Sequence, residues 1–446
     1  MTQGYYAGIS GLVSNQYGLD VISDNLANAS TTGFKSSSTE FADLFTQAIV
    51  SSGGSTPTSN DIGGGVRLQA TSYQMAQGTL MPSDRVTDLA LQGNGWFGVT
   101  GNNQEYFTRD GSFSFDAVQN IKGDINSSTS RLVNADGMYV TGTMLSNFIY
   151  DAALDYGDTA TNGVSGAYVL NNTTLDVPLS GVGQQGALEL PTRLAYPVTP
   201  TSQAKFLGNL GIEDQVRTIS TDLISASNEK NNLKLTFTRS EIQPTEGIAW
   251  DVAATVTSKN GTTLYDTQNA QVNFGPSGEL VSSTLTTINN NGTPVTINLG
   301  AQYSGLISTN GMGISGSSQS DGIAGGTLTK YGINTDGTII ADFSNGKQSA
   351  VGRVAVYHFQ NDQGLNRNGG TYYEQSSDSG KPLFWTDAAG NAVAGATVHS
   401  SKLEASNVRM EVGLTDMIVA QRAYQANSKT ITTVDEMIQK ALAMHR

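Results

Sequence analysis

The amino-acid sequence predicts an α+β protein in which a long helix at each end of the chain flanks a mainly β, multi-domain middle of sandwich or barrel type. Apolar residues recur at helical spacing near both ends, and short apolar–polar alternations separated by glycine-rich turns fill the middle. Only 14% of the residues are charged, while glycine occurs 51 times, which favours short strands over a thick helical core. The 446 residues are enough for about two to four domains.

Composition excludes several classes of function. With 24 basic and 38 acidic residues the net charge is −14, which argues against a nucleic-acid partner. The chain has no cysteine, so disulfides, thiol catalysis and cysteine-ligated metals are excluded. No apolar run approaches the ~18 residues of a membrane span, so we expect no membrane insertion. The first residues lack the pattern of a signal peptide, so any export is expected to proceed without a cleaved signal.

The N-terminal helix is expected from Gly4 to about Asn28, where the polar run Asn28 to Gly33 ends it. Its apolar stripe consists of Ile9, Leu12, Leu19, Ile22 and Leu26. Its glycines, which each cost roughly 1 kcal/mol relative to alanine in a helix interior, are Gly4, Gly8, Gly11 and Gly18. We therefore expect both chain ends to be disordered in the monomer and to become ordered on assembly. A stable intramolecular hairpin of the two end helices is the alternative.

The C-terminal helix is expected from about Ser406 to His445, and its heptad-like spacing suggests a coiled-coil seam. Between the helices, strands are predicted where apolar and polar residues alternate, as in Leu233 to Arg239, Val252 to Val256 and Val295 to Leu299. Turns are predicted at 275–280, 289–293 and 334–338, and a flexible loop or linker at 51–65.

No catalytic or metal-binding motif occurs in the sequence. The three histidines have no partner at ligand spacing, and the nucleophile, zinc and phosphate-binding patterns are missing. We therefore expect no enzyme, no metal and no cofactor.

Four segments resemble the bacterial flagellar axial proteins, which are the rod, hook and hook-associated subunits. The N-terminal match runs from Leu19 to Phe45, with Asn25-Leu-Ala-Asn28 and Thr32-Gly-Phe-Lys35 as its core. The C-terminal match has Leu403-Glu-Ala-Ser-Asn-Val408 and Met417 to Tyr424 as its core. Two internal matches resemble the first β-domain of this family: 63–99 followed by 106–116 resembles that domain in hook and distal-rod proteins, and 337–365 resembles its return half in hook proteins. Together the matches cover somewhat over half of the chain.

The resemblance implies a terminal helical polymerisation domain at 1–30 plus 402–446 and a linker or hairpin at 31–75. A first β-domain is expected at 76–145 plus 328–401, and an outer β-rich insertion of one or two domains at 146–327. The size of that insertion favours the hook subunit, which polymerises into a curved, flexible tube and transmits torque from rod to filament as a universal joint. A distal rod subunit or a hook-like paralogue is the alternative within the family. A secreted adhesin or surface-layer protein is an alternative from another class.

The family implies several partners besides the homopolymer itself. These are the rod protein, the hook cap or scaffold, the hook–filament junction protein and the flagellar type III export machinery. The expected location is extracellular, in the hook and basal body of the flagellum.

The residues expected to carry polymerisation lie in the two terminal segments. We expect the N-terminal stripe to bury against Leu414, Ile418, Tyr424, Ile431 and Ile438, while Gln421 faces neighbours or a wet lumen. Phe34 is expected to anchor the turn in the adjacent domain. The full predicted set is Leu12, Leu19, Ile22, Asn25, Leu26, Asn28, Gly33, Phe34, Lys35, Leu403, Ala405, Asn407, Val408, Leu414, Ile418, Gln421, Tyr424, Ile431 and Ile438.

Overall fold

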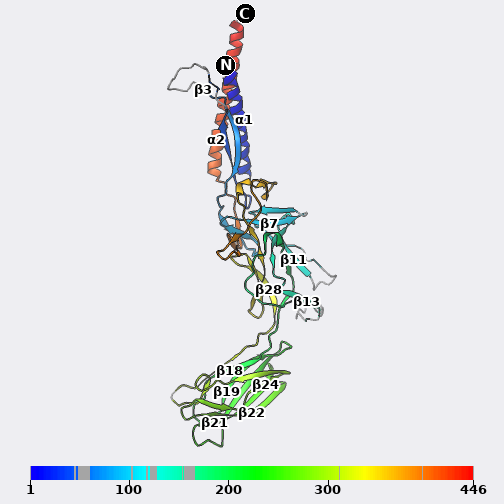
Figure 1. Ribbon diagram of the computed structural model, residues 1–446, viewed down its shortest axis with the longest axis vertical. Helices are drawn as coiled ribbons and strands as arrows, with labels where there is room; N and C mark the ends of the chain where they lie inside the picture. Colours follow the sequence, from blue (N-terminus) through cyan, green and yellow to red (C-terminus); the bar gives the residue numbers. More distant parts are fainter. Residues whose placement is uncertain are drawn as a thin grey trace.

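The molecule is elongated, with both termini at one end and a β-rich unit at the other (Figure 1). The computed structural model describes residues 2–44, 47–48, 61–101, 104–116, 119–120, 128–152, 154, 166–310, 312–393 and 395–444. Three parts follow one another along the long axis: a helical stem, a central β-unit and an outer β-unit (Figure 1). This arrangement confirms the predicted fold class, in which terminal helices flank a β-rich middle.

The stem contains the two long helices, α1 (Thr2–Ala27) and α2 (Met410–Met444). They run antiparallel, side by side, within one chain (Figure 1). Neither contains proline, and Glu411 in the first turn of α2 suits the positive end of that helix dipole. The pairing corresponds to the hairpin that the sequence left open as an alternative, and the need for assembly to order the ends stays a prediction. No helix in the described ranges is long and apolar enough to cross a membrane.

A β-hairpin lies along the stem and belongs to it. Strand β1 (Ser37–Asp43) pairs antiparallel with β4 (Val66–Tyr73), from Ser37↔Tyr73 to Asp43↔Val66, with a bulge after Glu40. Beyond it β2 (Gln47–Ala48) pairs with β3 (Asp61–Ile62). Of the loop or linker predicted at 51–65, residues 51–60 lie outside the described part of the chain.

The central β-unit is built on a sheet to which 17 strands contribute in the described part of the chain. Its core includes Leu89, Phe97, Phe113, Val351 and Val356, all at most 1% exposed. The strands are β7 (Trp96–Gly101), β8 (Gln104–Thr108), β9 (Ser114–Phe115), β10 (Gln119–Asn120), β11 (Ser128–Val133), β12 (Tyr139–Met144), β13 (Phe148–Asp151), β14 (Ala167–Leu170), β15 (Gly186–Ala187), β16 (Glu189–Pro191), β17 (Leu194–Tyr196), β28 (Gly326–Ile333), β29 (Thr338–Phe343), β30 (Gln348–Val354), β31 (Val356–Tyr357), β32 (Asn366–Arg367) and β33 (Tyr372–Glu374).

Short pairs complete the central unit. Strand β5 (Leu80–Pro82) pairs with β37 (Lys402–Glu404), and β6 (Leu89–Gln92) pairs with β36 (Thr397–Ser400). These two pairs bring the residues that follow the N-terminal hairpin beside those that precede α2. The remaining short elements are β34 (Trp385–Thr386), β35 (Ala392–Val393) and the 3₁₀ turns Val182–Gln184 and Asp362–Gly364.

The outer β-unit packs two sheets around one apolar cluster, whose large members include Phe206, Phe237 and Trp250, all fully buried. One sheet has the order β19 (Arg217–Ile224), β20 (Lys230–Arg239), β21 (Ile248–Ser258), β22 (Leu264–Phe274), β23 (Leu280–Ser283). The other has the order β24 (Thr287–Asn290), β25 (Thr293–Asn298), β18 (Gln203–Asn209), β26 (Leu306–Ile307), with β27 (Ser315–Ser320) also on β18.

The strands predicted in the outer β-unit and the turns predicted in the middle of the chain are confirmed. The predicted strands Leu233 to Arg239 and Val252 to Val256 fall within β20 and β21, and Val295 to Leu299 overlaps β25 except for its last residue. In all three, apolar side chains alternate between core and surface. The predicted turns contain Gly278, Gly292 and Gly337 at φ values of 85°, 88° and 85°, a conformation that favours glycine.

Candidate functional site

The stem holds its two helices together through a heptad seam on α2. Shielded positions on this helix recur at alternating spacings of four and three, which is the a/d pattern of a coiled coil. Val434 is the buried member, 7% exposed, and the others are half-buried. The seam is formed by Gly413, Met417, Ala420, Tyr424, Asn427, Ile431, Val434, Ile438 and Ala441.

On α1 the buried face is made of small residues. A Cβ atom at Gly8 would lie 3.1 Å from Cγ1 of Ile431, and one at Gly11 would lie 2.8 Å from Nδ2 of Asn427. The glycines therefore allow α2 to approach the backbone of α1 closely. A little further along, the Ser14 hydroxyl donates to the carbonyl of Val66, 3.2 Å away, and joins α1 to the hairpin.

The predicted apolar residues of α1 are half-buried. Leu12, Leu19, Ile22 and Leu26 all fall in this class, and Cδ2 of Leu26 lies 3.0 Å from where a Cβ of Gly413 would be. They flank the glycine face and do not form the centre of the interface.

The prediction that Leu414 and Ile418 bury against α1 is wrong. Their side chains are 50% and 59% exposed. Each follows a seam residue by one position, which turns it about 100° around the helix axis, away from α1. The glycines decide which face of α2 can come close, and that face is the one holding Tyr424 and Ile431. Gln421 is exposed as well.

The break after α1 is stabilised by short side chains that bind the backbone. The amide of Asn25 both donates to the carbonyl of Ser37 (2.7 Å) and accepts from the Ser37 N–H (2.8 Å). Asn28 donates to the carbonyl of Asp24 at 2.9 Å, and the Thr31 hydroxyl donates to the Asn28 side chain at 3.1 Å. These bonds end the helix and direct the chain toward β1.

Gly33 meets a constraint that only glycine satisfies. Its φ is +69°, and a Cβ there would lie 2.4 Å from the backbone nitrogen of Asp110. Its own N–H donates to the carbonyl of Glu404 at 2.8 Å. The backbone at this residue is therefore pressed between the central β-unit and the segment that leads to α2.

Phe34 is buried at 2% exposure beneath a charged side chain. The guanidinium of Arg367 lies 4.7 Å above its ring centre and also donates to Asp24 at 3.1 Å. One arginine of the central unit thereby joins the last turn of α1 to the segment after it.

Lys35 and Glu404 form a buried ion pair. Nζ of Lys35 donates to Oε1 of Glu404 at 2.7 Å, and both side chains are 1% exposed. Nη1 of Arg109, 5% exposed, donates to the other carboxylate oxygen at 3.2 Å. The N–H of Gly78 donates to Oε1 at 2.9 Å, and Nζ of Lys35 also donates to the carbonyl of Ala76 at 2.9 Å. A single carboxylate thus joins segments 369 residues apart.

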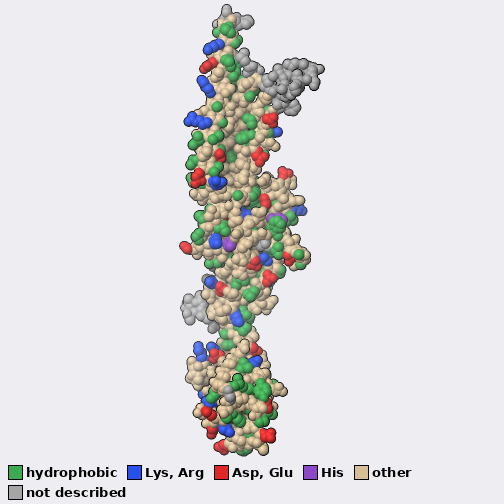
Figure 2. All heavy atoms as spheres, turned by 90° about the vertical axis from the view of Figure 1, so that its left-hand side faces the viewer, with side chains coloured by type: hydrophobic (Ala, Val, Ile, Leu, Met, Phe, Trp, Pro, Cys, Tyr) green, Lys and Arg blue, Asp and Glu red, His purple; other side chains and the backbone are tan. Residues whose placement is uncertain are grey.

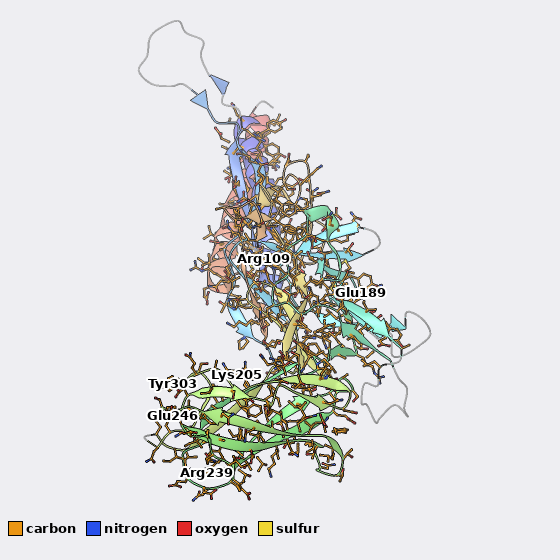
Figure 3. All side chains as sticks on the ribbon, turned by 60° about the horizontal axis from the view of Figure 1, so that its bottom comes forward. Arg109, Glu189, Lys205, Arg239, Glu246 and Tyr303 are labelled. Atoms are coloured by element: carbon orange, nitrogen blue, oxygen red, sulfur yellow. The ribbon has the colours of Figure 1, made fainter. Side chains whose placement is uncertain are left out.

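The electrostatics of this triad follow from burial. Burial lowers the pKa of Lys35; the charge of Glu404 opposes this effect and that of Arg109 adds to it. Burial also lowers the pKa of Arg109, against the attraction of Glu404. Arg109 donates further to the carbonyl of Gly93 at 2.7 Å and lies 5.7 Å from the ring centre of Trp96. Figure 3 labels Arg109 in the upper part of the molecule, away from the outer β-unit.

The predicted C-terminal residues meet the N-terminal ones here. The side chain of Asn407 accepts from the N–H of Ser36 (2.8 Å) and donates to the carbonyls of Gln74 (2.7 Å) and Ala76 (3.0 Å). Leu403 pairs with Met81 in the β5–β37 ladder. The remaining two are half-buried: Ala405, whose N–H donates to the carbonyl of Thr79, and Val408.

The two signature segments thus form one structure, which we call the junction: residues 24–37, 74–78 and 402–407 with Arg109 and Arg367. It joins both helices of the stem to the central β-unit.

Comparison with known proteins relates both the junction and the stem to one family. Three family models match the chain: "Flagella basal body rod protein" at 6–35, "Flagellar hook protein FlgE/F/G D1 domain" at 90–163 and "Flagellar basal body rod FlgEFG protein C-terminal" at 399–444. The flagellar hook protein FlgE of Rhizobium meliloti is 30% identical over 450 residues, covering 98% of each chain. The chain belongs to the flagellar hook protein FlgE family.

Other members of the FlgE family match over similar lengths. FlgE of Salmonella typhimurium is 28% identical over 434 residues, covering 96% of this chain and 97% of its own. FlgE of Borreliella burgdorferi is 27% identical over the full length of both chains. The crystal structure of Helicobacter pylori flagellar hook protein FlgE2 covers 73% of this chain and 100% of that chain at 16% identity, with a TM-score of 0.49, too low to relate the folds in detail.

Membership of the FlgE family confirms the prediction of a structural subunit of the flagellar hook. Sequence reasoning did not identify Glu404, Arg109, Gly78 or Arg367 as site residues. Glu404, Arg109 and Gly78 lie inside segments that resemble the family, and that resemblance is the signal that could have identified them. Arg367 lies outside these segments and gave no such signal, because its contacts are formed only by the fold.

Removing the shared carboxylate should destabilise the junction strongly. Glu404→Gln leaves Lys35 and Arg109 buried without their counter-charge, which we expect to cost about 3–5 kcal/mol. Hydrogen–deuterium exchange of peptides covering 33–37 and 402–407 measures the loss. Asp222→Asn is the matched control, because Asp222 pairs with Lys230 at a similar 2.8 Å but at an exposed position; it should cost at most about 1 kcal/mol. Equal effects of the two changes would contradict the role given to Glu404.

Gly33→Ala should also loosen the junction. The left-handed backbone alone costs an alanine about 1–2 kcal/mol, and the new Cβ would collide with the backbone at Asp110. Exchange of the Glu404–Asn407 peptide should therefore accelerate. Gly137→Ala provides the control, since Gly137 has a φ of 77° with open space around its missing Cβ. A Gly33→Ala protein no less protected than Gly137→Ala would show that the close approach is unimportant.

Proposed function

We propose that this chain polymerises through the outward face of its stem into the tube of the flagellar hook. The observation that carries the proposal is the row of large apolar side chains on α2 that do not face α1. Figure 2 shows hydrophobic side chains at intervals along the stem surface. The row near the start of α2 consists of Met410 (53% exposed), Leu414 (50%) and Ile418 (59%), at i, i+4 spacing. Val412 (41%) and Val419 (62%) are exposed on another side of the helix.

The energetics support assembly through this face. Each large apolar side chain contributes about 1.5–3 kcal/mol when fully buried, whereas association of two proteins costs about 4–15 kcal/mol. A single residue therefore gives no stable contact, and a row of several does. Membership of the FlgE family supports a second copy of the same chain as the partner. In the proposed polymer, neighbouring subunits are contacted by the outward residues Leu414, Ile418 and Gln421.

The rest of the predicted function is part of the same proposal. The polymer is a curved, flexible tube that transmits torque between rod and filament, and the role is structural and not catalytic. The partners at its ends are the rod protein, the hook cap or scaffold and the hook–filament junction protein. The subunit reaches its extracellular place through the flagellar type III export machinery without a cleaved signal peptide. The family and the absence of cysteine from the chain are compatible with that route.

We propose the predicted domain organisation with a narrower outer unit. Residues 167–170 and 194–196, expected in the insertion at 146–327, pair with each other and, through Ala195↔Thr327, with β28. The separate apolar cluster of the outer unit is formed by residues between Ala204 and Leu306. We therefore place the outer unit at about 199–323, and its contacts with neighbours are expected to change as the hook bends.

Replacing the outward residues should block polymerisation without unfolding the subunit. Leu414→Gln with Ile418→Gln changes side chains that are already exposed, so each should shift monomer stability by less than about 0.5 kcal/mol. The loss of two buried apolar side chains in the polymer should abolish tube formation. Electron microscopy after salting out gives the readout, and circular dichroism checks the helices. Tubes of normal length from this double variant would contradict the proposal.

The matched control changes the inward face. Val434→Gln places an amide at a seam position that is 7% exposed, so it should destabilise the stem itself and lower the helical signal of the monomer. The contrast between the two variants separates contacts between subunits from contacts within one.

Deleting Thr2–Ala27 should abolish polymerisation and leave a folded β-core. None of the four buried clusters found among the described residues includes a residue of α1. The deletion removes the Asp24–Arg367 bond and the Asn25–Ser37 pair, but it leaves the triad around Glu404 in place. Thermal unfolding followed by near-ultraviolet circular dichroism should remain cooperative. A non-cooperative transition would contradict the separation of stem and core.

A further inference from the structure

The side of α1 turned away from α2 carries exposed aromatic and acidic side chains. Tyr6 and Tyr17 are 66% and 49% exposed, and the side chain of Asp24 is also 49% exposed. These residues are 11 and 7 positions apart, and because each residue turns an α-helix by about 100°, all three lie within about 20° of one line. The line is about 160–200° around the helix from Gly8, which faces α2. We call it the aromatic face; α1 contains no lysine or arginine.

The side of α2 turned away from α1 carries basic side chains at the same spacings. Arg422, Lys429 and Lys440 are exposed and lie 7 and 11 positions apart, so they again fall within about 20° of one line. Lys429 is about 160° around the helix from the seam residue Ile431. Figure 2 shows lysine and arginine side chains spaced along one edge of the stem. Among the described residues, none of the three forms an ion pair. We call this line the basic face.

The two faces match when they belong to two copies of the chain in the same orientation. In that arrangement α1 of one copy and α2 of the other run antiparallel, as the two helices do within one chain. Read from its N-terminal end, the aromatic face has spacings of 11 and then 7; read from its C-terminal end, the basic face has the same two spacings in the same order. All three positions therefore coincide in one register. The pairs are Tyr6 with Lys440, Tyr17 with Lys429, and Asp24 with Arg422.

The charges are complementary in this register. Asp20, which is also exposed, lies between the levels of Arg422 and Lys429, and Glu436 is level with the uncharged Ser10. A lysine ammonium is attracted to the face of a tyrosine ring, and an arginine to a carboxylate. Each of these contacts is weak at an exposed position, so together they select the register, while burial of apolar side chains supplies most of the affinity.

The register between copies differs from the one inside a single molecule. There Gly8 lies against Ile431, which puts Tyr17 level with Arg422. Between copies Tyr17 is level with Lys429, so the neighbour is displaced by seven residues, or about 10 Å, along the stem axis. A contact between two different surfaces of identical subunits that includes such a displacement does not close into a ring and generates an open helix.

We infer that the aromatic face of α1 in one subunit packs against the basic face of α2 in the next, with Tyr17 opposite Lys429. This contact names two surfaces that meet in the polymer proposed above, and it rests on that proposed function. It sets the height at which neighbouring stems meet, and the 10 Å displacement makes the assembly helical.

Disulfide cross-linking tests the register because the chain has no cysteine. In the double variant Tyr17→Cys with Lys429→Cys, the two thiols of one molecule are separated by about 10 Å along the axis alone, whereas a disulfide needs Cβ atoms about 3.5–4.5 Å apart. Any bridge between positions 17 and 429 is therefore intermolecular. Tubes assembled from this variant and an equal amount of unmodified chain should, on oxidation, yield that bridge in peptide mass spectrometry, and reduction should remove it.

The matched control keeps the same face of α2 and changes only the register. Tyr17→Cys with Arg422→Cys joins two positions that are level within one molecule but on sides turned away from each other, so it too can bridge only between copies. We expect about tenfold less bridge from it than from the Lys429 variant. Equal yields, a higher yield from the Arg422 variant, or no bridge in tubes that contain the Lys429 variant would overturn the inferred contact and leave polymerisation intact. Failure of the unmodified chain to form tubes would overturn both.

An exchange of side chains tests the same contact without cross-linking. Lys429→Glu places a carboxylate opposite Tyr17 and near Asp20 of the neighbour, so the protein concentration needed for tube formation should rise about fivefold or more. Adding Tyr17→Lys restores an oppositely charged pair and should return this concentration to within about twofold of the unmodified chain. Both positions are exposed, so circular dichroism should show unchanged helical content in the monomers. An unchanged threshold in Lys429→Glu, or no recovery in the double variant, would overturn the inference.

Discussion

The attachment of the stem to the central β-unit depends on one buried carboxylate, that of Glu404. It accepts hydrogen bonds from Lys35, Arg109 and Gly78, while its backbone carbonyl accepts from Gly33. The side chains of both cations and of the carboxylate are at most 5% exposed, so each charge depends on the others for compensation. Because Lys35 follows α1 and Glu404 precedes α2, this centre holds both ends of the chain at one point. It thereby sets where the two helices leave the β-structure.

The buried face between the two helices has an unusual composition. Ordinary amphipathic helices turn their largest apolar residues inward. Here glycines occupy the buried face of α1, and close backbone approach replaces part of the side-chain contact. Leu414, Ile418 and Val419 are left outside, where one molecule alone cannot bury them. The same glycines that bring the two helices together thus leave an apolar surface available for other subunits.

Local periodicity in the sequence made much of this fold predictable. The contacts between segments that are distant in the sequence could not be predicted in this way. The two helices, the strand at Leu233 to Arg239 and the turn at Gly337 follow from spacing and from backbone preference. The orientation of Leu414 did not follow, because the glycines of a segment about 400 residues away select the face of α2 that packs. Strands of two to four residues between 148 and 196 carry no period, so their pairing with the central sheet was missed. The Lys35–Glu404 pair joins two matched motifs, but nothing in either motif indicates their contact.

The expected ordering of the ends on assembly and the observed helix pair are compatible in energetic terms. A helix with four glycines is weak by about 3–4 kcal/mol relative to alanine, and only one side chain of α2, Val434, is buried in the single chain. Such a pair of helices has a defined lowest-energy arrangement, but the free energy that stabilises this arrangement is small. Contacts between subunits that bury Leu414 and Ile418 would add their free energy to the same helices. Because those contacts require the helical conformation, assembly and ordering of the stem stabilise each other.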